Sequence, residues 1–179
     1  MKHDPPIKLS RLHGANGILS IKLPFWQGAG LELDVIGGPF DKYKPGQNAD
    51  VGVCVRAERV PETADFNLAI EDFQVPPPEM KDAFEATVVE VIRLSLAGKR
   101  VWVGCMGGYG RTGLFLAVLA KACCVYDPVA YVRLHYHEHA VETSAQRAYV
   151  HDFDVSAIQS WLFWHSWSRR WTNPWSWFQ

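Results

Sequence analysis

The sequence lacks the features that mark secreted and membrane-spanning proteins. It has four cysteines, at positions 54, 105, 123 and 124, with no Cys-x-x-Cys pair and no disulfide-framework spacing. No uninterrupted apolar run reaches the roughly 18 residues that a membrane-spanning helix needs. The first residues, Met-Lys-His-Asp-Pro-Pro, lack the apolar stretch of a secretory signal. We therefore expect free thiols and a cytoplasmic location.

A large excess of charge of one sign is also missing. The formal net charge is -1, so no global basic field favours nucleic acid or an anionic membrane, and we expect no nucleic-acid partner. The 179 residues, 48% of them apolar and 21% charged, are ordinary for a soluble globular chain. Residues 1–179 are therefore expected to form a single domain.

Hydrophobic periodicity and turn residues predict that strands and helices alternate. The triplet Gly37-Gly38-Pro39 is interpreted as a turn. The capping pattern Thr143-x-x-Gln146 is expected to open a late helix, broken near Asp154, that carries most of the tryptophans. Strands are expected at residues 18–23, 31–36, 51–55, 66–70 and 101–103, and earlier helices at residues 79–96, 114–123 and 127–139.

One segment between a strand and a helix combines three groups that suit phosphate chemistry. It reads Cys105-Met-Gly-Gly-Tyr-Gly-Arg111-Thr112-Gly113. Its glycines let the backbone curl so that successive N–H groups point inward as an anion nest, and the following helix adds a partial positive charge. Arg111 can clamp phosphate oxygens, and a thiolate is favoured at Cys105 in this field. Packing alone also produces glycine turns and buried cysteines, but the combination indicates a phosphate site. The predicted phosphate-binding residues are Met106, Gly107, Gly108, Tyr109, Gly110 and Arg111.

The pattern Cys105-x-x-Gly108-x-x-Arg111-Thr112-Gly113 resembles the signature loop of the protein tyrosine phosphatase superfamily, on its dual-specificity side. The similarity covers residues 51–153 approximately. It implies an α/β fold with a central, mainly parallel sheet flanked by helices. It also implies that Cys105 forms a phosphocysteine, that Arg111 stabilises the transition state and that Thr112 helps the thiolate to leave. No metal or cofactor is required.

Two further catalytic residues follow from the resemblance. Asp72 lies in Ile70-Glu71-Asp72-Phe73, which resembles the acid loop of the family, and it is our candidate for the proton donor. Glu71 and Asp65 are the alternatives, and a purely structural role for Asp72 stays open. Gln146 matches the glutamine that positions the hydrolytic water, although it also fits the capping box alone.

The resemblance implies a phosphoprotein or phosphopeptide substrate, carrying phosphotyrosine, phosphoserine or phosphothreonine. A nucleotide or small-molecule phosphate stays open. The family usually has His before the nucleophile, whereas this chain has Gly104. That departure supports a rival interpretation, a phosphate-binding pseudophosphatase or adaptor with little turnover.

Two weaker patterns remain. His135 and His139 are spaced i,i+4, but a zinc site needs further ligands, so no metal site is predicted. The tail, residues 155–179, holds six of the eight tryptophans, and we expect this face to pack chiefly against the domain. A protein partner or a membrane interface is the less favoured alternative.

Overall fold

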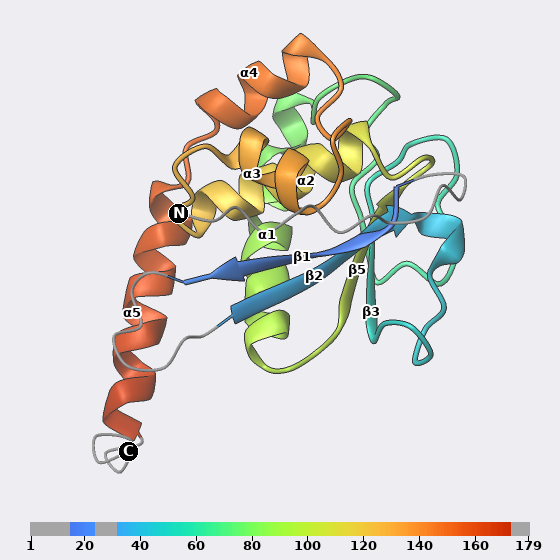
Figure 1. The fold of residues 1–179 in the computed structure, drawn as a ribbon. Helices are drawn as coiled ribbons and strands as arrows, with labels where there is room; N and C mark the ends of the chain where they lie inside the picture. Colours follow the sequence, from blue (N-terminus) through green and yellow to red (C-terminus); the bar gives the residue numbers. More distant parts are fainter. Residues whose placement is uncertain (1–14, 24–31, 173–179) are drawn as a thin grey trace.

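The protein is seen in a computed structural model that describes residues 15–23 and 32–172, with side chains described up to residue 164 (Figure 1). A five-stranded sheet lies at its centre in the order β1-β2-β5-β3-β4. Strand β1 is antiparallel to β2, and every other neighbouring pair is parallel. The strands are β1 (Gly17–Lys22), β2 (Glu32–Pro39), β3 (Val51–Cys54), β4 (Phe66–Asn67) and β5 (Val101–Cys105). The helices are η1 (Phe40–Lys42), η2 (Pro78–Met80), α1 (Lys81–Leu96), α2 (Gly110–Ala122), α3 (Pro128–His135), α4 (Ser144–Asp152) and α5 (Ser156–Thr172), where η is a 3-10 helix.

The two faces of the sheet are covered differently. The main core joins Val35, Val53 and Val103 on the sheet to buried residues of helices α1 to α5. The opposite face is covered by η1 and the loop after it, where Phe40 packs with Trp102. Right-handed crossovers explain this division, because β2→β3 and β4→β5 run in opposite directions across the sheet. The predicted α/β fold, with a mainly parallel sheet flanked by helices, is confirmed.

Several predicted boundaries were wrong. Helix α2 begins at Gly110, inside the predicted loop, instead of at residue 114. Gly37-Gly38-Pro39 is not a turn but the end of β2, paired in parallel with the end of β5. Aromatic side chains explain the glycines there, because a Cβ at Gly38 would lie 2.7 Å from the Trp102 ring. Strand β4 has two residues instead of five, and α3 ends at His135 instead of near His139.

Helix caps agree with the sequence. The Asp127 side chain accepts a hydrogen bond from the Ala130 N–H at 3.0 Å, which starts α3. The predicted capping box is present at α4, where Thr143 and Gln146 satisfy each other's backbone N–H groups. The break near Asp154 is also present, since its carboxylate accepts from the Ser156 N–H at 2.9 Å and α5 begins there.

One lysine ties two helices together. The Lys121 ammonium, at the end of α2, donates to the carbonyls of Val150 and Phe153 at 3.0 and 2.9 Å, and also to that of His151. These carbonyls lie at and just beyond the C-terminal end of α4, where a cation is favoured. We call this contact the Lys121 clasp. It joins the C-terminal ends of α2 and α4.

Helix α5 is only partly packed against the body. Ile158 and Leu162 are buried in the core, and Trp161 packs against it, whereas the side chains of Phe163 and Trp164 are exposed. Figure 1 shows the C-terminal turns of α5 extending past the sheet. The side chains of the later tryptophans lie outside the described part of the chain. Within the described residues, no helix combines the length and apolar character needed to cross a membrane.

Candidate active site

The loop between β5 and α2 closes around the sulfur of Cys105. The Gly108 N–H donates to Cys105 Sγ at 3.2 Å, and the Cys105 side chain is buried. The Cys105 N–H in turn donates to Thr112 Oγ1 at 2.9 Å, which leaves the hydroxyl hydrogen of Thr112 available for another acceptor. The loop lies at the carboxyl ends of parallel strands, where α/β folds place their ligands. The Gly108 N–H therefore points toward the inside of the loop, as an anion nest requires.

Arg111 is buried and surrounded by acceptors. Its two terminal nitrogens pair with the Glu58 carboxylate at 2.6 and 2.8 Å. Nη1 also donates to the Ile70 carbonyl at 2.9 Å, and Nη2 lies 3.0 Å from Asp72 Oδ1. The bidentate bond from Arg111 holds the pKa of Glu58 below its ordinary value, although burial opposes the shift. The guanidinium is thus held in a fixed orientation at the loop.

The structure brings Asp72 to the loop on a segment with an unusual backbone. Asp72 is half-exposed and accepts a hydrogen bond from the Phe73 N–H at 3.1 Å. Phe73 has a φ of 59°, in the left-handed region that a bulky residue rarely adopts. Thr143 Oγ1 donates to the Phe73 carbonyl at 3.3 Å, and Gln146 Nε2 donates to the Gln74 carbonyl at 3.2 Å. These bonds hold the segment against the start of α4.

Gln146 lies beside the loop between β5 and α2. It is fully buried, and a Cβ at Gly110 would lie 3.1 Å from its Nε2. The carboxylate of Glu142 stands against the same glycine, although Glu142 itself is exposed. The Gln146 amide and the Glu142 carboxylate therefore stand next to the loop. The sequence analysis had selected the amide but not Glu142.

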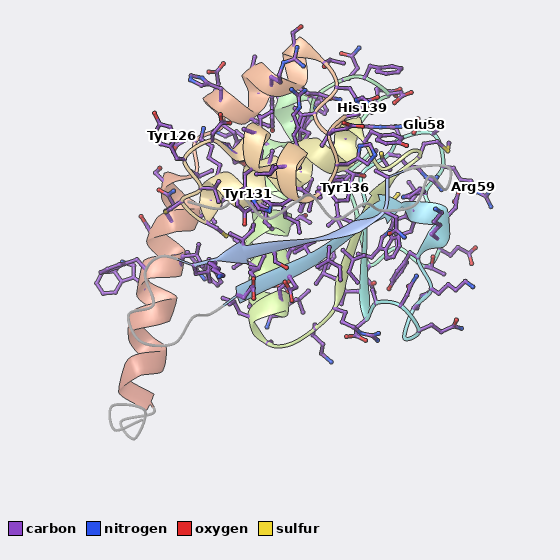
Figure 2. The ribbon with its side chains drawn as sticks, viewed as in Figure 1. Glu58, Arg59, Tyr126, Tyr131, Tyr136 and His139 are labelled. Carbon is purple, nitrogen blue, oxygen red and sulfur yellow. The ribbon has the colours of Figure 1, made fainter. Side chains whose placement is uncertain are left out.

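Sequence reasoning also missed Glu58 and Arg56, which follow β3. Arg56 is fully buried, donates from Nη2 to Asp41 at 2.7 Å, and lies 3.6 Å from the sulfur of Met106. Figure 2 labels Glu58 beyond the carboxyl ends of the parallel strands. Polar residues directly after a parallel strand were the available signal, because that edge of the sheet gathers functional groups.

Gly104 has a packing explanation. A Cβ there would lie 2.6 Å from the Gly38 carbonyl oxygen and 2.8 Å from the backbone N and Cα of Phe40. These are backbone atoms of β2 and η1, so they cannot turn aside as a side chain could. Any side chain, histidine included, would have to displace β2. The close approach of β2 to β5 therefore requires a glycine at this position.

We predict that Gly104→Ala lowers stability. The added methyl forces β2 away from β5, and overpacking of this kind costs about 1–3 kcal/mol. The free energy of unfolding, measured in urea, checks this. Gly107→Ala is the control, because only the Tyr109 ring approaches its Cβ, at 3.0 Å. Equal stability of wild type and Gly104→Ala would contradict the packing explanation.

The structure also shows where the two alternative proton donors lie. Asp65 accepts from the Gly52 N–H at 2.8 Å and from the Tyr43 hydroxyl at 3.2 Å, on the face of η1, so it is not a proton donor at this loop. Glu71 is exposed. Within residues 15–23 and 32–172, no group of three His, Cys, Asp or Glu residues is arranged to hold a metal ion.

The chain has the fold of the protein tyrosine and dual-specificity phosphatases. It superposes on kinase associated phosphatase with a TM-score of 0.55 at 19% identity, covering 78% of this chain and 94% of that one. It is also similar to Tk-PTP in its active form, with 24% identity and a TM-score of 0.47 over 63% of this chain and 80% of the other. The resemblance in fold expected from the signature loop is thus confirmed.

Sequence comparison adds relatives without a described function. The uncharacterized proteins MJECL20 and MJ0215 of Methanocaldococcus jannaschii are each 40% identical over 87 residues, which is 48% of this chain. The matched stretch is 56% of the first and 52% of the second, so the chain spans about half the length of these relatives. No protein-family model matches the chain.

Proposed function

We propose that this protein is a cysteine-dependent phosphatase that hydrolyses phosphomonoesters through a phosphocysteine at Cys105. The observation that carries the proposal is the buried sulfur, which accepts an inward N–H from Gly108 at the end of the loop that also contains Arg111. Asp72 pairs with that same arginine, so nucleophile, anion site and acid meet at one point. The phosphatase fold supports the same conclusion.

In the first step the Cys105 thiolate attacks phosphorus. The S–P bond forms while the P–O bond to the leaving group breaks, and Asp72 gives its proton to the departing oxygen. The loop amides and Arg111 stabilise the charge that develops on the equatorial oxygens. Because Glu58 occupies both terminal nitrogens, we infer that phosphate takes Nε and the Nη2 hydrogen now shared with Asp72. Phosphate binding then releases the Asp72 carboxylate from Arg111, and Asp72 takes up a proton from solvent before it acts as the acid.

In the second step a water held by Gln146 attacks phosphorus. The O–P bond forms, the S–P bond breaks, and the water proton passes to the Asp72 carboxylate. The hydroxyl hydrogen of Thr112 is available to stabilise the returning thiolate, since Thr112 Oγ1 already accepts from the Cys105 N–H. Inorganic phosphate leaves, and the enzyme regains its starting protonation state.

The surroundings of the loop support phosphorylated tyrosine, serine or threonine of proteins as the substrate. Phe73 and Met106 are exposed apolar side chains, on the acid segment and on the loop respectively. No Lys or Arg stands between Cys105 and Arg111 to favour a multiply phosphorylated head group. An apolar rim suits an aromatic leaving group, so phosphotyrosine is the preferred form.

The test is hydrolysis of p-nitrophenyl phosphate with and without vanadate, followed by phosphotyrosine, phosphoserine and phosphothreonine peptides. We expect vanadate-sensitive turnover that persists in EDTA, because no step needs a metal, and the highest kcat/KM on the phosphotyrosine peptide. Binding of vanadate without turnover of any substrate would instead identify a phosphate-binding module. Loss of activity in EDTA would contradict the metal-free mechanism.

A further inference from the structure

The backbone of the phosphate loop is held from outside by a tyrosine that the mechanism above does not use. The Tyr136 hydroxyl donates to the Gly108 carbonyl at 2.7 Å, and only 4% of the Tyr136 side chain is exposed. The ring lies against Gly37 of β2, where a Cβ would come within 2.6 Å of it. The sheet therefore leaves a place for this ring, and the ring reaches the loop from the segment after α3.

The hydrogen bond from Tyr136 to the Gly108 carbonyl also determines the direction of the next N–H group, that of Tyr109. In a trans peptide the carbonyl and the following N–H point in opposite directions. The preceding peptide shows the effect, because the Ala15 N–H donates to the Gly107 carbonyl at 2.9 Å while the Gly108 N–H points to Cys105 Sγ. By the same geometry, the bond from Tyr136 to the Gly108 carbonyl turns the Tyr109 N–H inward. Gly108 has a φ of 81°, which lets two successive peptides adopt this arrangement.

A ring contact and the protonation state of Tyr136 support this arrangement. The ring of His137, the next residue after Tyr136, meets the Tyr109 ring edge-on with centroids 4.7 Å apart. Burial, with smaller contributions from Cys105 and Tyr109, raises the pKa of Tyr136 well above its ordinary value, so the hydroxyl keeps its proton and stays a donor. The segment after α3 thus holds both the backbone and the side chain of Tyr109.

We propose that Tyr136 is a positioning residue for the phosphate loop, fixing the Gly108–Tyr109 peptide so that the Tyr109 N–H faces the bound phosphate. It supplies from outside the loop the ordering that no side chain at Gly104 could supply, because β2 fills that space. The inference rests on the proposed function for its catalytic consequence. Its structural part concerns the binding of a phosphate-like anion alone.

The test is Tyr136→Phe, with Tyr131→Phe as a matched control. The Tyr131 hydroxyl also donates to a backbone carbonyl, that of Ser20, at 2.6 Å. Figure 2 shows Tyr136 on the side of Glu58 and Tyr131 nearer to α5. Each variant removes one hydroxyl and one hydrogen bond to a carbonyl, so a general loss of stability is common to both.

Vanadate bound in the loop should protect Cys105 from alkylation by iodoacetamide, which mass spectrometry measures. This assay reports anion binding at the loop and does not require turnover. We expect Tyr136→Phe to need roughly tenfold more vanadate for half-protection, the effect of one misdirected hydrogen bond, while Tyr131→Phe matches wild type. With p-nitrophenyl phosphate, Tyr136→Phe should lower kcat/KM by a similar factor. Equal vanadate protection in the two variants would overturn the proposal. If the wild-type protein binds vanadate but hydrolyses no substrate, the proposed function is wrong. The protection assay would still decide whether Tyr136 positions the loop.

Discussion

Cys105→Ser should abolish hydrolysis of p-nitrophenyl phosphate while phosphate binding survives. The serine hydroxyl is a far weaker nucleophile than a thiolate, and removal of a covalent nucleophile costs on the order of 10⁴-fold in kcat or more. The Gly108 N–H, Arg111 and the start of α2 all remain, so the anion site stays intact. Steady-state kinetics and calorimetric titration with inorganic phosphate measure the two effects separately.

Cys123→Ser is the control for this experiment. Cys123 is buried at the end of α2, away from the loop, and burial raises the pKa of its thiol to about 12. We expect its substitution to leave kcat unchanged. Near-normal turnover in Cys105→Ser would refute the covalent mechanism. Loss of phosphate binding together with turnover would mean that the sulfur organises the loop instead of attacking the substrate.

Asp72→Asn should slow a substrate with a poor leaving group far more than an activated one. The amide keeps an oxygen for the Phe73 N–H but has no proton to give, so hydrolysis of phenyl phosphate should fall by roughly 10²–10⁴-fold. A dinitrophenyl leaving group needs little protonation, and its rate should change much less. The ratio of kcat values for the two substrates is the measurement.

Glu71→Gln is the neighbouring control and should leave that ratio unchanged, because Glu71 is an exposed carboxylate outside the contacts of Arg111 described above. If Asp72→Asn slows both substrates equally, its role is to hold Arg111, and the acid must be sought among the carboxylates beside the loop. Glu142→Gln would then be the next variant, since Glu142 stands against Gly110.

The parts of this molecule that obey local rules could be predicted from its sequence. The Asp127 cap and the Thr143–Gln146 capping box depend on residues close together in the chain, and both formed where expected. The loop that starts at Cys105 also lies between a strand and a helix, as expected, although α2 already begins at Gly110. Long-range contacts could not be predicted in this way. Gly37 and Gly38 looked like a turn because the aromatic rings that fill the space beside them come from distant segments.

The same distinction between local and long-range contacts applies to the residues of the candidate site. Cys105, Arg111 and Thr112 belong to one contiguous motif and could be selected together. Glu58 lies 53 positions before its partner Arg111, and Tyr136 lies 28 positions after the glycine that it holds. Such pairings follow from tertiary packing, and no spacing rule within the sequence indicates them.

The Lys121 clasp has a consequence for how the site can open. Helices α2 and α4 are joined at their C-terminal ends by the clasp, and their N-terminal ends meet where Gln146 lies beside Gly110. Contact at both ends limits hinging of α2 against α4, so the loop before α2 and the Gln146 amide keep a fixed relation to each other. The segment that carries Asp72 is held to these helices by side-chain contacts. Arg111 contacts Asp72 and the Ile70 carbonyl. Thr143 and Gln146 donate to the carbonyls of Phe73 and Gln74. We expect any movement that admits substrate to occur in this segment, because its side-chain contacts can break while α2 and α4 stay joined.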